Sequence, residues 1–94
     1  MEVADKTEIF HQFLGEFLRD HREEKGISLD QATTGCESGL SKNSLSLIEK
    51  GQQKINAFQL MELSEHLAFS ISDAFEYANL ATKRNQYPEL KEVL

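Results

Sequence analysis

Apolar residues recur every three or four positions along this chain, and no segment alternates in the way that a β-strand does. The first apolar stripe predicts a helix from about Thr7 to Lys25, with Gly26 as its C-terminal stop. The inward positions of this helix are Phe10, Phe13, Leu14, Phe17, Leu18 and His21. Because every periodic segment has helical spacing, we expect an all-α fold.

Short polar residues followed three positions later by glutamine or aspartate mark the starts of further helices. These pairs are Ser28 with Gln31, Asn56 with Gln59, and Ser70 with Asp73. Ser41 is the expected cap of a third helix that stops at Gly51, and Pro88 breaks any helix that arrives from the preceding segment. The pattern therefore predicts a compact bundle of about five short helices. The inner stripes of the fourth and fifth are Leu60, Leu63 and Leu67, and Ala74, Phe75 and Ala78.

A carboxylate lies on the apolar face of the predicted third helix. Glu49 comes one turn after Leu45, where a lone charge would be costly to bury. Arg22 borders the inward stripe of the first helix, so the two charges can form a bidentate pair that ties helix one to helix three. Alternatively, Glu49 tilts outward and pairs with Lys50 or Lys54 in solvent, where it would contribute little.

Composition limits the classes that remain. The chain has 94 residues, enough for one domain, and is 39% hydrophobic and 28% charged, as in ordinary globular proteins. Its net charge of −6 argues against coating nucleic acid by bulk attraction. There is no membrane span and no signal-peptide pattern, and the single cysteine fits a reducing, cytoplasmic setting. We divide the chain into a flexible N-terminus over 1–8, a domain over 9–78 and a C-terminal extension over 79–94.

No constellation indicates catalysis or a cofactor. His11, His21 and His66 do not share a metal-ligand spacing with each other or with Cys36, so no metal is expected. The glycines lack a phosphate-cradling motif. The chain is therefore not expected to be an enzyme.

Several motifs together resemble the helix-turn-helix domain of the lambda-repressor-like regulators, of the Cro/cI or Xre type. They are LGEFLRDHREEKGISLDQA, GLSKNSLSLIEKG, LMELSEHL and SISDAF, which together span roughly residues 14–76. The resemblance places the family's arginine–glutamate pair on Arg22 and Glu49. It also makes Ser41 the start of the recognition helix, which would enter the major groove of DNA.

The resemblance implies a set of DNA contacts. Lys42 could serve guanine or phosphate, and Asn43 could pair bidentately with adenine. Ser46 can go to either, and Leu47 could pack on a thymine methyl. The starts of helices two and three, near Ser28 and Ser41, would offer backbone amides to phosphate. The complete expected set is Ser28, Ser41, Lys42, Asn43, Ser46, Leu47, Lys50, Gln52 and Lys54.

The expected function is a sequence-specific transcriptional regulator, a repressor, that binds a double-stranded operator as a homodimer. The chain departs from the family pattern at Leu29 and Leu47 and in the longer connection TTGCESG. These departures and the acidic total support an alternative, a helix-turn-helix fold that binds a protein partner with weak or no DNA binding. The apolar residues of the last segment either fold back on the domain or form a dimer surface: Tyr77, Leu80, Tyr87, Leu90, Val93 and Leu94.

Overall fold

The computed structural model describes residues 5–86, which form five α-helices. The helices are α1 (Lys6–Glu24), α2 (Leu29–Thr33), α3 (Lys42–Glu49), α4 (Ala57–His66) and α5 (Ile71–Gln86). No strand occurs within 5–86. The expected all-α class and the expected five helices are therefore confirmed for this part of the chain.

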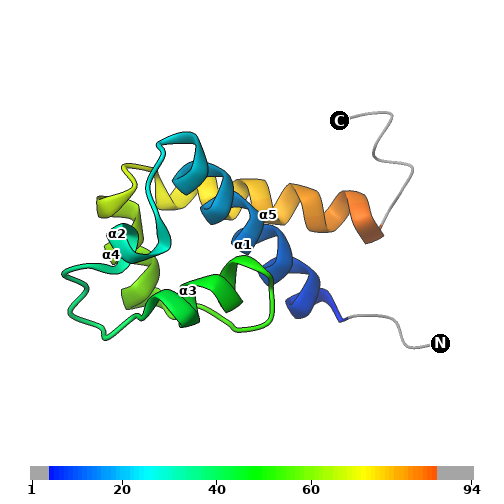
Figure 1. Cartoon of the computed structure of the whole chain (residues 1–94). Helices are drawn as coiled ribbons and strands as arrows, with labels where there is room; N and C mark the ends of the chain where they lie inside the picture. The colour runs from blue at the N-terminus through cyan, green and yellow to red at the C-terminus, as the bar shows by residue number, and fades with distance from the viewer. Residues whose placement is uncertain (1–4, 87–94) are drawn as a thin grey trace.

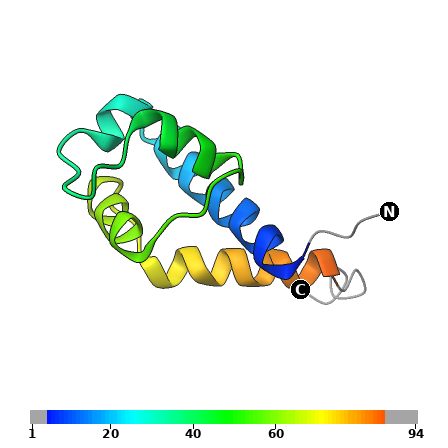
Figure 2. The ribbon, with the colours of Figure 1, turned by 90° about the horizontal axis from the view of Figure 1, so that it is seen from below.

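The two longest helices, α1 and α5, run antiparallel and lie side by side (Figures 1 and 2). The first residues of α1 and the last turns of α5 meet at one end of the molecule. Helices α2 and α4 lie at the opposite end, and α3 packs along α1 and against α2. Helix α3 is thus held by α1 and α2.

One apolar core receives side chains from all five helices. Its buried members are Leu14, Phe17, Leu18, Ala32, Leu40, Leu45, Ile48, Leu60, Leu63, Leu67, Ala74 and Ala78. Full burial of a leucine or isoleucine side chain stabilises the fold by roughly 1.5–3 kcal/mol, so this cluster holds the helices together. The expected inward position of Phe75 is wrong, because this side chain is 46% exposed. Ala74 and Ala78, one turn apart, occupy the buried face of α5 instead.

The helix starts follow the capping pattern of the sequence. The Ser28–Gln31 and Asn56–Gln59 pairs both form reciprocal capping boxes. The Ser70–Asp73 pair is looser, with the Asp73 N–H donating to Ser70 Oγ at 3.4 Å. Helix α1 is capped by Asp5, whose Oδ1 accepts from the Glu8 N–H at 2.9 Å. The flexible N-terminus predicted for 1–8 is therefore too long, because helix begins at Lys6; residues 1–4 lie outside the described residues.

The boundary predicted after residue 78 is also wrong. Helix α5 continues without a break to Gln86, so 79–86 belongs to the domain and not to a separate extension. Thr82 is 1% exposed and continues the buried face of Ala74 and Ala78. Four tail positions lie outside the described residues: Tyr87, Leu90, Val93 and Leu94.

Candidate nucleic-acid interface

A bidentate ion pair joins α1 to α3. Arg22 Nε donates to Glu49 Oε2 at 2.7 Å, and Arg22 Nη2 donates to Glu49 Oε1 at 3.0 Å. Arg22 Nη1 also donates to the carbonyl oxygen of Ile27 at 2.9 Å, which ties the turn before α2 to the same group. The two charged side chains are only 13% and 5% exposed. The structure therefore contains the Arg22–Glu49 pair that the helical periodicity predicted. It does not contain the alternative, in which Glu49 points to solvent and pairs with Lys50 or Lys54.

The ion pair keeps both charges in a setting that is partly withdrawn from water. Hydrogen bonding to Glu49 raises the pKa of Arg22 above its ordinary value, and burial opposes this effect. Arg22 therefore carries its positive charge at neutral pH, as an ordinary arginine already does. The pair fixes the last turn of α3 against α1, and this sets the direction in which the rest of α3 faces.

A close backbone approach supports the same junction. Gly15 of α1 is buried, and a Cβ atom built there would lie 2.9 Å from the carbonyl oxygen of Glu49. It would come closer still to the carbonyl oxygen of Ile48. Only glycine lets α1 and the C-terminal end of α3 pack at this separation. The sequence signal was a glycine in the middle of a strongly periodic helix.

Helix α3 has one buried face and one polar face. Leu45 and Ile48 are buried with Glu49, while Lys42, Asn43, Leu47 and Lys50 are exposed and Ser46 is half-buried. The five residues expected to face DNA therefore share the surface that the core does not cover. In the segment between Leu40 and Asn56 the charged residues are Lys42, Glu49, Lys50 and Lys54. Because Arg22 neutralises Glu49, this surface is locally basic on a chain of net charge −6.

The two serines expected near phosphate are helix caps. Ser28 Oγ accepts from the Gln31 N–H at 3.0 Å, and Ser41 Oγ accepts from the Ser44 N–H at 3.1 Å. The Ser28 N–H donates to Gln31 Oε1 at 2.8 Å. The capping box therefore uses the N–H of Ser28 itself, which leaves the phosphate contact expected at this helix start to the amides near it. Both serines remain exposed.

Gln52 and Lys54 follow α3 and are exposed. Gly51, with a φ of +75°, ends the helix in the left-handed region, where a side chain would be strained. Lys54 lies near α1, because its charge adds to the effect of burial in lowering the pKa of His11. These two positions thus flank the polar face of α3 and do not extend it.

Sequence reasoning missed Glu62, a buried carboxylate on α4. It accepts from the backbone N–H groups of Glu37 at 2.6 Å and Ser38 at 3.2 Å, in the long connection between α2 and α3. The nearby Ser38 hydroxyl, followed by these two N–H groups, lowers the pKa of Glu62 below its ordinary value against the opposing effect of burial. Glu62 therefore fixes the connection that positions the start of α3. Its signal in the sequence was a charge beside the inward Leu63.

The same connection contains Cys36. Its sulfur lies 3.8 Å from His66 Nδ1, which in turn is 2.9 Å from the carbonyl oxygen of Ala32. Burial, and then the charge of Glu62, raises the pKa of the Cys36 thiol. A raised thiol pKa makes Cys36 a poor nucleophile. The contacts of His66 with Cys36 and Ala32 hold α2 and the connection after it against α4.

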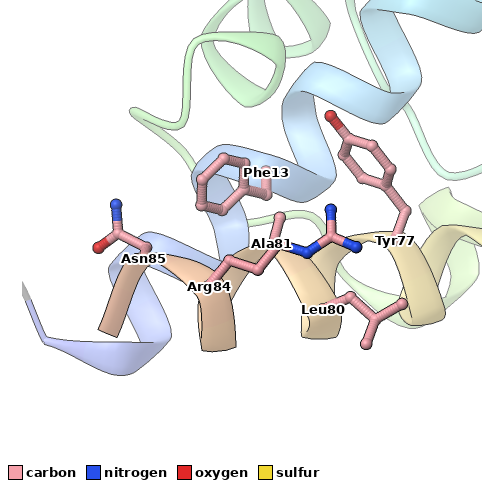
Figure 3. Close-up of a pocket in the computed structure, with 6 residues that line it drawn as sticks. All are labelled: Phe13, Tyr77, Leu80, Ala81, Arg84 and Asn85. Atoms are coloured by element: carbon pink, nitrogen blue, oxygen red, sulfur yellow. The ribbon is translucent and has the colours of Figure 1, made fainter. Parts of the chain in front are cut away.

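A groove runs between α1 and α5 on a different part of the molecule. It has a volume of about 530 Å³ and is lined by Phe13, Tyr77, Leu80, Ala81, Arg84 and Asn85 (Figure 3). The Tyr77 hydroxyl donates to Glu16 Oε1 at 2.8 Å, and Arg84 Nε is buried without a hydrogen-bond partner among the described residues. Tyr77 and Leu80 of the apolar segment thus lie in the wall of a groove.

Two other features are absent from the described residues, a cluster of metal ligands and a membrane-spanning helix. Within 5–86 no group of three or more histidine, cysteine, aspartate or glutamate side chains is placed to share a metal ion. None of the helices there combines the length and the hydropathy needed to cross a membrane. In comparisons with known proteins, no family model, curated protein or solved structure matches this chain.

Proposed function

We propose that this protein is a sequence-specific DNA-binding transcriptional regulator, a repressor of the lambda-repressor-like helix-turn-helix type. In this proposal α2 and α3 form the helix-turn-helix, and α3 enters the major groove of a double-stranded operator. The protein acts in the cytoplasm and has no catalytic step and no cofactor. It binds DNA through a local basic surface, since its net charge of −6 excludes general attraction.

The observation that carries the proposal is the Arg22–Glu49 pair. By neutralising the one carboxylate of α3 it leaves the exposed face of that helix with lysines and uncharged hydrogen-bonding groups. The same pair and the close approach at Gly15 hold α3 rigidly, and a rigid element positions base contacts better than a loop does.

The exposed side chains suit the edges of bases. Asn43 can pair with adenine in two hydrogen bonds, and Lys42 with guanine or a phosphate. Ser46 can serve either base, and the exposed Leu47 can pack on a thymine methyl group. Lys50 lies on the same face, and Gln52 and Lys54 follow the helix. These three would meet the sugar–phosphate backbone, which fixes position without reading sequence.

The experiment that tests this function is selection of bound duplexes from a random pool by the full chain. We expect one sequence to be enriched and to bind with a steep dependence on salt concentration, as phosphate contacts require. A pool that stays random after repeated selection would contradict sequence-specific binding.

We further propose that the regulator is a homodimer and that its operator is pseudo-palindromic. Two recognition helices on one duplex face must lie about one helical turn apart, roughly 34 Å. The groove between α1 and α5, lined in part by Phe13, Tyr77 and Leu80, offers apolar area for a symmetric contact. Sedimentation of the full chain tests this, with a concentration-dependent dimer as the expected result and a monomer at all concentrations against it.

A second candidate is a helix-turn-helix fold that docks a protein partner, as an antitoxin or antirepressor does. The observation that favours it is the exposure of Phe58 and Met61, three residues apart on one face of α4, in addition to Phe75. Titration of a random-sequence duplex at falling salt concentration separates the two functions. Binding with a steep salt slope supports the regulator, and no binding even at low salt supports the protein-docking module.

A further inference from the structure

The groove between α1 and α5 has the size and the lining of a small-molecule site. Its volume of about 530 Å³ falls within the range of roughly 300–1,000 Å³ that is usual for such sites. Phe13 of α1 lines one side, and Leu80 and Ala81 of α5 line the other, so most of the surface offered to a ligand is apolar (Figure 3). None of the residues proposed to contact DNA is among the lining residues.

Arg84 is the one charged residue among the described residues that line the groove. Its guanidinium is directed along α5 towards Tyr77, which lies two turns earlier on the same helix (Figure 3). It forms no ion pair with any described residue, and its Nε is buried without a hydrogen-bond partner among them. A buried donor without a partner costs free energy, so an acceptor that reaches this guanidinium binds favourably.

A carboxylate fits this donor better than other anions do. Its two oxygens can accept from Nε and one Nη of a guanidinium at the same time, in a charge-assisted pair. The lining supplies only this one cation, and Glu16 brings a negative charge to the groove wall, where it accepts from the Tyr77 hydroxyl at 2.8 Å. A single negative charge is therefore favoured over the roughly two charges of a phosphate monoester.

We propose that the groove between α1 and α5 binds an apolar carboxylate of the medium-chain fatty-acid class, with its head group on Arg84. The hydrocarbon body packs against Phe13, Leu80 and Ala81, and removal of this apolar surface from water favours binding. The same groove offers the apolar area for the proposed dimer contact, so the ligand and a second copy of the chain compete for it. This effect on the dimer rests on the homodimer proposed above, while the ligand site itself does not.

The first arm of the test titrates octanoate into the full ¹⁵N-labelled chain. The matched probe is 1-octanol, which has the same number of carbons and no charge. We expect saturable chemical-shift changes at the amides of Leu80, Ala81 and Arg84, and about tenfold tighter binding of octanoate than of 1-octanol. Arg84→Gln should remove this preference for octanoate. Lys83→Gln is the control, because it removes an exposed cation that lies next in the chain and outside the groove lining, and it should keep the preference.

A second variant tests the apolar part of the site. Ala81→Leu adds hydrocarbon to the groove lining and should weaken the binding of both probes. Two results would overturn the site. One is the absence of saturable shifts with octanoate, which would leave the groove to a second copy or to residues 87–94. The other is an unchanged preference for octanoate in R84Q.

The second arm measures the dimer by sedimentation of the full chain. Octanoate should lower the dimer fraction of the wild type more than 1-octanol does at the same concentration, and the two probes should act equally on R84Q. Bound octanoate with an unchanged dimer fraction would overturn the competition. Octanoate binding by a chain that stays monomeric at all concentrations would keep the site and reject the proposed homodimer. Selection of duplexes from the random pool measures DNA binding separately, so the ligand site and the regulator function can fail independently.

Discussion

The α-carbon of Gly15 lies so close to Glu49 that a Cβ atom there would be 2.9 Å from the Glu49 carbonyl oxygen. This approach and the ion pair from Arg22 act on the same turn of α3, one through the backbone and one through the side chain. The orientation of α3 therefore depends on a glycine as much as on a charge.

A Gly15→Ala substitution tests this close approach, because the sign of the change in the free energy of unfolding shows whether a side chain fits there. Helix propensity alone predicts that alanine would stabilise α1 by about 1 kcal/mol. The clash with the Ile48 and Glu49 carbonyl oxygens predicts a loss of about 1–3 kcal/mol in the free energy of unfolding, measured by urea denaturation. Asp20→Ala, at an exposed position of the same helix, is the control and should be neutral or slightly stabilising. A stabilised G15A protein would show that α1 and α3 do not pack this closely.

The ion pair can be examined by comparing single and double substitutions. Glu49→Ala leaves the Arg22 guanidinium, 13% exposed, without its partner, so we expect a loss of about 3 kcal/mol in the free energy of unfolding. Replacing both, Arg22→Met with Glu49→Leu, removes the unpaired charge and should restore most of that loss. If E49A and the double variant lose the same free energy of unfolding, the loss in E49A does not come from the unpaired charge of Arg22.

Glu62 predicts a dependence of stability on acid pH. Its folded pKa is lowered below the ordinary value of 4.5, so its contribution is fully present above that value and is lost as pH falls through the folded pKa. The denaturation midpoint of the wild type should therefore fall more steeply below pH 4.5 than that of Glu62→Gln, which should already be destabilised at pH 7. If the denaturation midpoints of the two proteins fall in parallel with pH, Glu62 does not cause the loss of stability in acid.

Tyr77 predicts a dependence at the alkaline end. Burial, followed by its hydrogen bond to Glu16, raises the pKa of Tyr77 to about 12 from 10.0. Since the folded pKa is the higher one, the stabilisation is complete below pH 10 and is lost as pH rises from 10 towards 12. Ultraviolet titration should resolve two tyrosine transitions, and Tyr77→Phe should remove the later one. A single transition near pH 10 in the wild type would contradict the contact with Glu16.

Much of the fold was predictable because it follows from local chemistry. Capping residues and glycines predicted the helix boundaries to within a few residues. Helical periodicity predicted the contact between Arg22 and Glu49. Phase alone did not separate Phe75 from its buried neighbour Ala74, because the width of the buried face depends on what packs against it. Gly15 and Glu62 were missed for a related reason. Their partners are backbone atoms of distant segments, which carry no side-chain signature.

The candidate site shows the same division. The polar face of α3 could be predicted from periodicity, and the structure places its residues on one surface. The groove lined by Phe13, Tyr77 and Arg84 was not predicted, because it exists only once α1 and α5 are packed together.

Whether the outer face of α3 reads DNA can be measured by the affinity of the K42A/N43A variant for the selected duplex. Both residues are exposed, so the variant should stay folded by circular dichroism. The control is N79A/K83A, which removes the same two residue types from the exposed surface of α5. We predict a loss of about 10- to 100-fold for K42A/N43A, equivalent to about 1–3 kcal/mol for a good base contact, and no change for the control. Equal affinity of K42A/N43A and wild type for that duplex would show that Lys42 and Asn43 on the outer face of α3 do not read DNA.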